Sequence, residues 1–491
     1  MAYVQSLFEK NFLEYASYVI KDRAIPHIDD GLKPVQRRIL HSLFEMDDGK
    51  FHKVANVVGH CMKYHPHGDA SIYEALVVLA NKGYFMDTQG NFGNIYTGDV
   101  ASAARYIETR ILPFAKQVLY RPEITVWDDS YDGRNKEPNT FPAKIPTVLL
   151  MGAEGIAVGM STKILPHNFV EVMEALKCAL RGESFQLLPD FPTAGIMDAS
   201  AYADGMGKVL VRAKLDTSDP KRIVITELPF GSTTETLIES IEQAAKRGKI
   251  KIAGIQDFTT DQVEIEVTLA RGVYTQDTVD ALYAFTDCEQ SISVNLLVIG
   301  PDNRPVAMTV TEVINYHAKR LVQILKQELE LELKNLLEKL HARTLERIFI
   351  EERIYKKIEE MKTAEAVVQA VKDGFKPFEA ELRKLKTRAA LDELVTDEDV
   401  ERLLKIPIRR ISLFDINKAR KEMAEIEAAI ALCRKRLANL TEYALDFVDG
   451  LLAQEGKKWP RLTVIKRFDK VDVREAAVRN LTMRYDPQTG S

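Results

Sequence analysis

The sequence is poor in the features that mark secreted and membrane proteins. Its 491 residues include 4 cysteines, which lie far apart without a Cys-x-x-Cys pair, and this argues against a disulfide framework and a cysteine-based structural zinc site. Apolar runs such as residues 147–151 are far shorter than the roughly 20 residues of a membrane-spanning helix. Glu9, Glu14 and Asp22 interrupt the N-terminal segment, so it does not resemble a secretory signal. We therefore expect a protein of the reducing cytoplasm.

Motifs for nucleotide binding and for common hydrolases are also missing. The chain contains no Gly-x-x-x-x-Gly-Lys-Ser/Thr loop, and residues 152–159 lack the spacing of the dinucleotide fingerprint. No Gly-x-Ser-x-Gly elbow is present, although a Ser-His-Asp or Cys-His site without that elbow stays open. The chain is not expected to hydrolyse ATP itself.

Neither sign of charge dominates the composition. The 67 Lys and Arg residues face 72 Asp and Glu residues, for a net charge of -5, so bulk charge does not indicate a polyanionic partner, and any such partner must be bound by a local patch. Six of the 9 histidines lie within the first 67 residues, which directs attention to the N-terminal region. At roughly 150 residues per domain, the length suggests about three domains.

Residues 1–136 are expected to form several helices joined by tight turns. Over residues 34–46, apolar side chains fall on one half of a helical wheel and polar side chains on the other. One face should pack while the other presents charge. The charged face carries Arg37, Arg38, His41 and Glu45.

Two more helices are expected after this one. The first covers residues 53–63, residues 64–69 form a turn, and the next helix begins at Ser71, where Ser-Ile-Tyr-Glu matches a capping box. Helix, short turn and helix is the arrangement of the helix-turn-helix motif.

From residue 137 to 312 the pattern changes to strands. Four segments are rich in Val and Ile with partial alternation, which predicts a mixed α/β domain. These segments are 208–215, 222–228, 262–269 and 293–299.

Two long helical arms are expected after residue 311. Apolar residues alternate at spacings of three and four in the second arm, as in a coiled coil, and more loosely in the first. The charged segment 342–412 between them contains Gly374, Pro377 and Pro407, which favours an antiparallel coiled coil within one chain, ending in a small tip. The seam residues are Ile416, Ala419, Met423, Ile426, Ile430, Cys433, Leu437, Leu440, Ala444 and Phe447 in the second arm, and Ile314, Ala318, Leu321, Leu325, Leu329, Leu333, Leu336 and Leu340 in the first.

Six short strings carry a family resemblance. They are Arg23-Ala-Ile-Pro26, Asp30-Gly-Leu-Lys-Pro-Val-Gln-Arg-Arg38, Lys63-Tyr-His-Pro-His-Gly-Asp69, Gln89-Gly-Asn-Phe-Gly93, Ala103-Ala-Arg-Tyr-Ile-Glu108 and Gly155-Ile-Ala-Val-Gly-Met160. Together they resemble the breakage-reunion part of the type IIA DNA topoisomerase A subunit of bacteria, that is, of DNA gyrase and topoisomerase IV. The resemblance runs in order from Phe8 to about Asp486.

The resemblance implies an α+β multidomain fold. We expect a winged-helix (helix-turn-helix) DNA-binding and cleavage domain at 1–136, an α/β tower domain at 137–312, and a long antiparallel coiled coil at 313–478. A small helical dimer-gate tip would lie at about 342–412. Residues 479–491 would be a tail or the start of a missing C-terminal domain, because the last eight resemble the first strand of the DNA-wrapping domain of longer relatives.

The resemblance also assigns the cleavage chemistry. Tyr106 matches the nucleophile that attacks a DNA phosphate and becomes 5'-phosphotyrosyl. Exchanging a phosphodiester for a phosphotyrosine ester conserves bond energy, so religation needs no ATP. Arg105 matches an arginine that stabilises the charged transition state, and Arg23 a second arginine near the scissile phosphate. A free phenol with a pKa of about 10 requires a neighbouring base or cation to react at neutral pH.

Further residues match DNA contacts in the family. Lys33, His65 and His67 match residues around the cleavage site, and Ile156 matches an isoleucine that wedges between base steps and bends the duplex. Arg37 and Arg38 lie beside Lys33 and are expected to contact phosphates.

Other interpretations stay open at the level of the sequence. Tyr106 is one of 17 tyrosines and could be a half-buried aromatic residue. Arg37 and Arg38 could form a solvated helix face, and Ile156 could lie in a core. A metal cluster of His60, Cys61, His65 and His67 fits no common zinc spacing.

The strings depart from the family pattern at two positions. Ile107 follows the tyrosine where many relatives have threonine, which removes a hydroxyl from its surroundings. Ala70 stands where fluoroquinolone-sensitive relatives commonly carry serine, with Ser71 next to it and Glu74 four residues on, so the drug response is open.

By resemblance, the partners are double-stranded DNA, a second copy of the chain and a separate B subunit, in an A2B2 assembly associated with the nucleoid. The B subunit would bind ATP and the catalytic Mg²⁺, and this chain would bind neither cofactor alone. Residues 15–20 and 87–90 favour the A subunit of topoisomerase IV, with that of DNA gyrase as the alternative. A hypothesis from another class is a non-enzymatic helix-turn-helix architectural protein that dimerises through its coiled coil; it leaves the string around Tyr106 unexplained.

Overall fold

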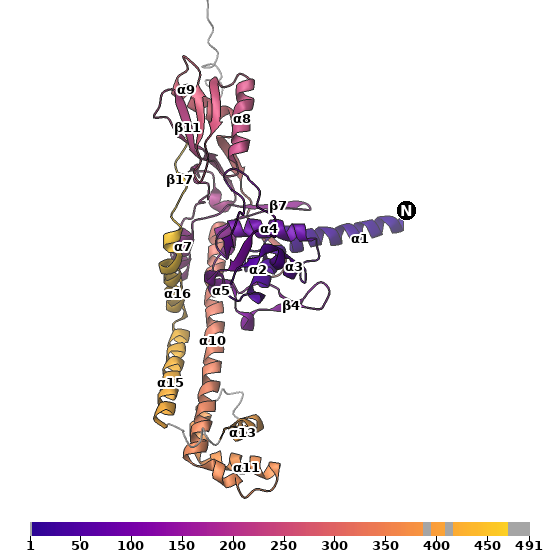
Figure 1. Ribbon diagram of the computed structural model, residues 1–491, viewed down its shortest axis with the longest axis vertical. Coiled ribbons are helices and arrows are strands. Elements are labelled where there is room, and N and C mark those ends of the chain that lie inside the picture. The colour runs from indigo at the N-terminus through magenta and orange to yellow at the C-terminus, as the bar shows by residue number, and fades with distance from the viewer. Residues whose placement is uncertain (1, 386–393, 408–415, 470–491) are drawn as a thin grey trace, which may run out of the picture. The chain divides into compact units, whose positions relative to one another are not determined.

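The computed structural model describes residues 2–385, 394–407 and 416–469 (Figure 1). The chain forms two compact units, one from residues 1–321 with the segment that begins at residue 447, and one from residues 322–446. Both units are rich in helix and all the sheets are small, so the expected mixed α+β class is confirmed. Among the described residues, no helix is long and apolar enough to cross a membrane.

The first part of unit 1 is mainly helical. A three-stranded antiparallel sheet in the order β1-β3-β2 packs beside its helices, and β4 and β5 form a hairpin. The helices are α1 (Ala2–Val19), the π-helix η1 (Ile20–Ala24), α2 (Pro34–Glu45), α3 (Val54–Cys61), α4 (Asp69–Asn81), α5 (Pro113–Leu119) and the 3-10 helix η2 (Pro122–Ile124). The strands are β1 (His52–Lys53), β2 (Met86–Gln89), β3 (Glu108–Ile111), β4 (Trp127–Asp129) and β5 (Lys136–Pro138).

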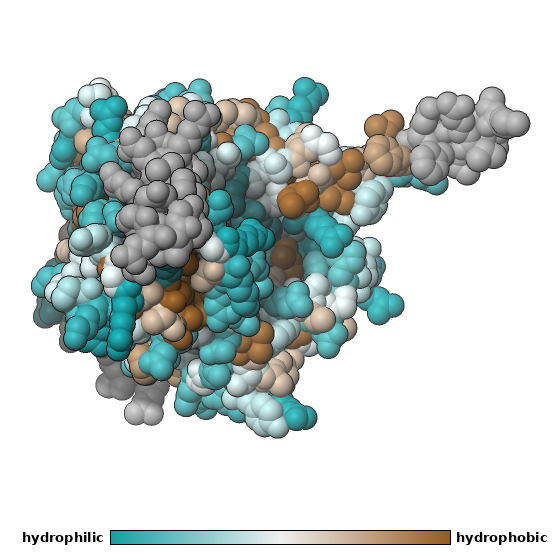
Figure 2. Space-filling view, turned by 90° about the horizontal axis from the view of Figure 1, so that it is seen from above, coloured by the Kyte–Doolittle hydropathy of each residue, from teal (hydrophilic) through white to brown (hydrophobic). Residues whose placement is uncertain are grey.

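Helix α1 projects from the rest of this region (Figure 1). Apolar surface lies along the projecting arm at the right of Figure 2. Phe12, Leu13 and Tyr15 are 49%, 67% and 56% exposed.

Two predictions for this region are wrong. The third helix begins at Asp69 instead of Ser71, and the Ser71 hydroxyl donates to the Gly68 carbonyl (2.7 Å) instead of capping the helix, because Ser71 already lies in its first turn. The polar face of α2 is not simply solvated either. Arg37 and His41 are 7% and 2% exposed, since other segments of unit 1, including Trp127 of β4, pack against them.

The middle of unit 1 contains most of the strands. The antiparallel sheet β10-β11-β13-β12 shares a core with α8 and α9, and a second sheet has the order β14-β9-β8-β17, with β17 parallel to β8. The strands are β6 (Ala153–Ala157), β7 (Met160–Ile164), β8 (Ile196–Asp198), β9 (Lys208–Arg212), β10 (Lys214–Asp216), β11 (Arg222–Glu227), β12 (Ile252–Asp257), β13 (Ile265–Leu269), β14 (Glu289–Ser293), β15 (Leu297–Ile299), β16 (Pro305–Ala307) and β17 (Val464–Ile465). The helices are α6 (Thr147–Met151), α7 (Phe169–Arg181), η3 (Ala203–Gly205), α8 (Thr234–Lys246) and α9 (Thr275–Phe285).

Two of the four predicted strands are each divided in the structure. Segment 208–215 forms β9 and β10, which belong to different sheets on either side of Ala213. Segment 293–299 contains only the last residue of β14 and then β15, and Asn295 between them bridges to Lys163 of β7. Apolar patterning did not reveal these changes of partner, because the alternation of apolar residues along a segment does not identify the strand with which it pairs.

Unit 2 consists of paired helices and a small tip. Helix α10 (Val310–Glu351) contributes to both units, as does α16 (Leu440–Glu455), which precedes the turn η7 (Gly456–Lys458). The other elements are η4 (Ile354–Ile358), α11 (Ala364–Phe375), η5 (Lys376–Phe378), α12 (Glu379–Arg383), α13 (Asp397–Leu404) and α15 (Ile416–Ala438).

The expected antiparallel pairing of the arms within one chain is present in unit 2. Leu340 of α10 packs with Ile426 and Ile430 of α15, which runs beside it in Figure 1. Ion pairs join Arg343 to Glu422 at 3.4 Å and Glu351 to Arg420 at 3.7 Å. Residue numbers therefore rise along α10 as they fall along α15, which is the mark of an antiparallel pair.

The arms differ from prediction at their ends. The first arm continues to Glu351 instead of ending near residue 342, and its last turns enter the tip core through Leu345, Ile348 and Phe349. The second arm is interrupted at Asn439, between α15 and α16. Residues 386–393, 408–415 and the predicted tail at 479–491 lie outside the described residues.

Candidate functional site

Tyr106 lies on a tethered loop immediately before β3. The Val54 amide donates to the Ile107 carbonyl (3.0 Å) and the Ala55 amide to the Ala104 carbonyl (3.1 Å), so the start of α3 holds the loop on both sides of the tyrosine. Ile107 is fully buried, whereas Tyr106 is 63% exposed. The loop is thus anchored by its backbone and by Ile107 while it presents the phenol to solvent.

A second tether comes from α4. The Tyr73 hydroxyl donates to the Ser102 carbonyl at 2.7 Å. Two helices, α3 and α4, therefore hold the backbone of the loop that carries Tyr106.

Arg105 covers the ring of Tyr106. Its guanidinium carbon lies 4.7 Å from the ring centroid, in cation–π geometry, and both side chains are exposed. A positive charge beside the phenol stabilises the negative charge that develops on a group that the phenol oxygen attacks. This pair has the geometry expected of a nucleophile and its cationic neighbour.

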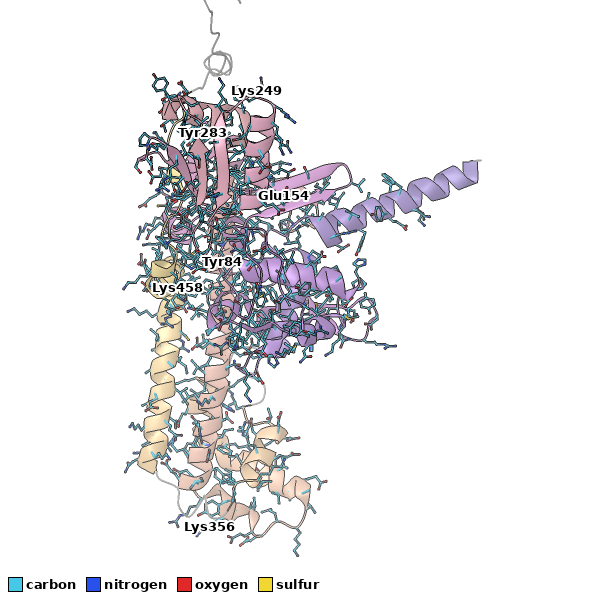
Figure 3. All side chains as sticks on the ribbon, turned by 45° about the horizontal axis from the view of Figure 1, so that its top comes forward. Tyr84, Glu154, Lys249, Tyr283, Lys356 and Lys458 are labelled. Carbon is cyan, nitrogen blue, oxygen red and sulfur yellow. The ribbon has the colours of Figure 1, made fainter. Side chains whose placement is uncertain are left out.

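Lys33, Arg23 and Ile156 gather around the β6–β7 hairpin. The Lys33 ammonium donates to the Glu154 carbonyl at 2.6 Å, and Glu154 lies on this hairpin in Figure 3. Gly155 approaches η1, the helix that carries Arg23, so closely that a Cβ would lie 2.1 Å from the Ala24 carbonyl oxygen. Only glycine fits there. Ile156 follows and is 82% exposed.

An isoleucine so exposed at a hairpin is unusual for a core residue. The buried-strand interpretation of Ile156 is therefore wrong, because its side chain has little protein to pack against. The exposure suits a residue that inserts into a partner.

Lys33 and Lys82 bring two positive charges close to each other near this hairpin. Burial lowers the pKa of the Lys33 ammonium, and the charge of Glu154 opposes the change. Burial also lowers the pKa of Lys82, and the charge of Lys33 lowers it further. Lys82 was not predicted from the sequence, since a single lysine at the end of a helix has no motif around it.

His65 and Arg38 form a linked pair that is only partly accessible. Arg38 is bound by both Glu137 oxygens, at 2.6 and 3.1 Å, and its Nη1 lies 3.3 Å from His65 Nδ1. Burial, followed by the charges of Arg38 and His67, lowers the pKa of His65 to about 4. His65 is thus neutral at physiological pH and 8% exposed, which speaks against the direct phosphate contact predicted for it. His67 is exposed, and its Nε2 bonds with the Tyr18 hydroxyl.

Arg37 is the clearest correction among the predicted DNA contacts. Its Nε and Nη2 bind the two oxygens of Asp30 at 2.6 and 2.8 Å, and Nη2 also donates to the Leu32 carbonyl. The Arg37 side chain is 9% exposed, and its Nε and Nη2 are already bonded. Arg37 therefore holds the loop before α2 and is poorly placed to contact a phosphate.

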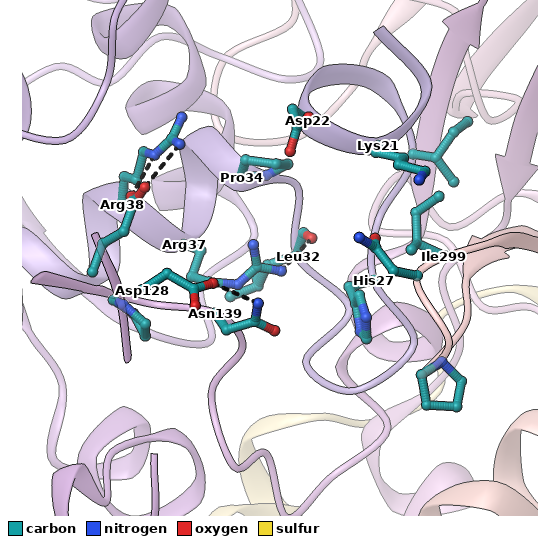
Figure 4. Close-up of a pocket in the computed structure, with 15 residues that line it drawn as sticks. Lys21, Asp22, His27, Leu32, Pro34, Arg37, Arg38, Asp128, Asn139 and Ile299 are labelled. Carbon is teal, nitrogen blue, oxygen red and sulfur yellow. Dashed lines mark hydrogen bonds and ion pairs between the residues drawn. The ribbon is translucent and has the colours of Figure 1, made fainter. Parts of the chain in front are cut away.

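A polar cavity of about 370 Å³ lies beside these arginines (Figure 4). Asp22, His27 and Lys21 line it together with Arg37 and Arg38. Burial raises the pKa of Asp22, although the positive charges of Arg38 and Lys21 act against this. Because both arginines are already paired with carboxylates, the cavity carries little net positive charge.

Five of the predicted residues form two groups. One consists of Arg105 and Tyr106, and the other contains Arg23, Lys33 and Ile156. Within the described residues, no hydrogen bond, ion pair or ring contact joins the first group to the second.

The described part of the chain contains no cluster of three or more His, Cys, Asp or Glu side chains placed to hold a metal ion. Cys61 of the alternative zinc cluster is buried, and burial raises the pKa of its thiol to about 12.

Comparisons with known proteins converge on one family. The model of a family described as the A subunit of DNA gyrase/topoisomerase IV matches residues 23–448. The A subunit of DNA topoisomerase 4 from Borreliella burgdorferi is 52% identical over 97% of this chain and 75% of the relative. The DNA gyrase A subunits of Brachyspira hyodysenteriae and Lawsonia intracellularis are 31% and 33% identical over 89% and 87% of this chain. The chain spans 54% of the length of each of these gyrase subunits.

Proposed function

This chain belongs to the family formed by the A subunits of DNA gyrase and topoisomerase IV, and we propose that it is the DNA-cleaving and rejoining subunit of an ATP-dependent type II topoisomerase, a DNA isomerase. The observation that carries the proposal is the exposed Tyr106 on a tethered loop with the Arg105 guanidinium over its ring. An architectural DNA-binding protein would have no need of this pair.

The reaction is a reversible transesterification. The Tyr106 oxygen loses its proton and attacks a DNA phosphorus; the bond from phosphorus to the 3' oxygen breaks, and that oxygen takes up a proton. The product is a 5'-phosphotyrosyl ester and a free 3'-hydroxyl. Religation runs the same steps in reverse, and because one phosphoester replaces another, neither direction consumes ATP.

The charged residues divide this work. Arg105 would stabilise the extra negative charge of the transition state, because its guanidinium lies over the Tyr106 ring. Arg23 and Lys33 would hold phosphates on the side of the β6–β7 hairpin, where Ile156 would enter the stack of bases and bend the duplex. Arg37, Arg38 and His65 would then stabilise the structure around the site instead of contacting DNA.

We propose a role for each region. Residues 1–136 would be a winged-helix domain, 137–312 a tower that supports bent DNA, and 313–478 a coiled coil that ends in a dimer gate. A twofold dimer would bring one Tyr106 to each strand of the duplex. The work is passage of a second duplex through a transient double-strand break, as in decatenation and relaxation during chromosome segregation.

A separate protein subunit would complete the enzyme. A B subunit would supply ATP binding and the Mg²⁺ at the cleavage site in an A2B2 assembly in the cytoplasm, on the nucleoid. Exposed Phe12, Leu13 and Tyr15 on α1 offer an apolar surface suited to a protein partner. The 52% identity over 97% of the chain favours topoisomerase IV activity, with negative supercoiling as the gyrase alternative.

The decisive experiment is denaturant trapping of protein on DNA. The chain, mixed with B subunit, ATP, Mg²⁺ and supercoiled DNA, should leave protein bound to 5' ends after detergent. Relaxation, decatenation and supercoiling assays on the same mixture separate the two subtypes. A chain that binds DNA but never yields a covalent adduct would support the architectural alternative.

A further inference from the structure

We propose that an aromatic cavity in unit 1 binds a small, flat aromatic molecule that carries one acidic group. The cavity has a volume of about 250 Å³ and lies where the end of α4, the start of α7 and the segment 459–462 meet. It is separate from the polar cavity beside Arg37, and neither the cleavage chemistry nor the family comparison assigns it a role.

Two stacked aromatic pairs belong to the wall. Tyr84 and Trp459 stack with ring centroids 4.2 Å apart and an interplanar angle of 17°, and Phe191 and Phe230 stack at 4.4 Å and 14°. Stacked rings present flat apolar surfaces, and these suit a planar ring better than a branched chain. The walls therefore select for shape as well as for low polarity.

The cavity is reached past apolar side chains. Ile95 and Leu462 belong to its lining, yet they are 41% and 46% exposed. An apolar ligand that covers exposed apolar groups at the mouth of a pocket removes their surface from water, which is favourable. They also give the ligand a path from solvent.

Most polar groups in the wall already have partners. His167 is bonded on both sides, through Nδ1 to the Leu149 carbonyl (3.2 Å) and through Nε2 to the Tyr202 hydroxyl (3.0 Å). Asp190 accepts from Asn168 and from the Leu462 and Thr463 amides. These groups hold the wall together and have little bonding capacity left for a ligand.

Lys82 is different. Lys82 is one of the residues that line the cavity, and within the described part of the chain no carboxylate pairs with it. The nearby charge is that of Lys33, which is of the same sign. A half-buried cation without a counter-charge is stabilised by an anion. One acidic group on the ligand would supply the negative charge that is missing beside Lys82.

The site lies next to the loop that leads to Tyr106. The Tyr96 carbonyl accepts from the Thr234 amide at the start of α8 (2.8 Å), and Ile95 and Tyr96 both line the cavity. A bound ligand would contact this part of the loop directly. Such a ligand would restrict the motion of the loop that precedes Tyr106. The effect of this on cleavage rests on the proposed function, whereas the binding itself does not.

The chain offers a local reporter for the test. It has 2 tryptophans, so Trp127→Phe leaves Trp459 in the cavity wall as the only one. Cinnamate is a flat aromatic acid, and cinnamamide matches its shape without the charge. Titrating the Trp127→Phe protein with cinnamate should give a saturable change in Trp459 fluorescence below about 1 mM. Cinnamamide should bind at least about tenfold more weakly.

Two lysine variants locate the acidic group. Lys82→Met should weaken cinnamate binding by about tenfold or more and leave cinnamamide binding unchanged. Lys458→Met is the matched control, because Lys458 precedes Trp459 but pairs with Glu455 at 2.7 Å and is exposed (Figure 3). Thermal unfolding of each variant confirms that it is folded.

Several results would overturn the proposal. These are the absence of saturable binding, equal affinities for cinnamate and cinnamamide, and unchanged cinnamate binding by Lys82→Met. Equal losses in both lysine variants would also overturn it. A Lys82→Met protein that loses DNA affinity but keeps cinnamate binding would assign Lys82 to a phosphate instead. None of these measurements uses DNA cleavage, so a failure here is distinct from failure of the topoisomerase assignment.

Discussion

Asp29 and Asp30 are adjacent in the chain, and their carboxylates hold two different helices. Asp30 is fully buried and binds Arg37 of α2 in a two-pronged ion pair. Asp29 accepts from the Tyr316 hydroxyl at 2.5 Å and pairs with Arg320 at 3.1 Å, both on α10. These bonds therefore hold the turn between η1 and α2 both to α2 and to the first part of α10.

Breaking the Asp30 link should cost much of the stability of unit 1. Burial acts to raise the pKa of Asp30, but the charge and hydrogen bonds of Arg37 and the Phe141 amide outweigh it and lower the pKa. Asp30→Asn would leave Arg37 buried without its counter-charge, so we expect a loss of about 3–5 kcal/mol in urea unfolding. Asp302→Asn is the control, because Asp302 is 64% exposed and 4.0 Å from Arg304. A similar small change in both variants would contradict the prediction.

Acid should destabilise unit 1 through its buried histidines. Burial lowers the pKa of His167 and His317 from 6.5 to about 4. The unfolded chain therefore binds an extra proton at each position between these values. Each histidine contributes stability that is complete above pH 6.5 and is lost as the pH falls toward 4, at about 1.4 kcal/mol per pH unit.

Urea unfolding at about pH 7.5 and about pH 5 measures this dependence. In His317→Leu, the difference between the two pH values should shrink by about 2 kcal/mol relative to the parent. An unchanged difference would show that His317 does not carry this part of the pH dependence.

Tyr106→Phe should abolish the covalent adduct and leave folding and DNA binding nearly intact. Only the nucleophilic oxygen is removed, and the exposed ring can still stack with Arg105. Detergent trapping on labelled DNA, together with a binding titration, measures both properties. Adduct at the parent's level would falsify the nucleophile assignment.

Alanine substitutions of Arg105 and Lys33 should impair different steps of the reaction. Arg105→Ala is expected to slow cleavage and religation by about a hundredfold or more, because it removes charge beside the reacting phenol. Lys33→Ala should mainly weaken binding and lower the salt dependence of the affinity by about one unit of slope. Single-turnover cleavage rates and binding at several salt concentrations separate the two profiles, and identical profiles would refute the division of roles.

Ile156→Ala should reduce DNA bending without destabilising the fold. The side chain is 82% exposed, so its removal leaves no cavity. Energy transfer between dyes at the two ends of a duplex measures the bend, and cleavage should fall by about tenfold if the wedge helps to open the base step. Ile156→Leu retains an apolar wedge and should behave nearly as the parent does. Normal bending by the alanine variant would remove Ile156 from this role.

The sequence by itself determined those features that depend on neighbours along the chain. The amphipathic pattern of 34–46 found α2, and the three-four spacing found the seam that Ile426 and Ile430 form with Leu340. The string around Tyr106 predicted the nucleophile, since a motif of adjacent residues can be recognised without coordinates, and this assignment stays a prediction. Helix periodicity and local motifs need no knowledge of distant partners.

The tertiary structure alone decided which polar residues are free. Arg37 looked like a solvated cation, but Asp30 and the Phe141 segment enclose it. His65 is neutral because Arg38 and burial act on it, and Lys82 faces an aromatic cavity partly built by a segment nearly 380 residues away. Burial and charge at a side chain depend on segments brought together by folding, and the energy of a buried ion depends on those partners far more than on its neighbours in sequence.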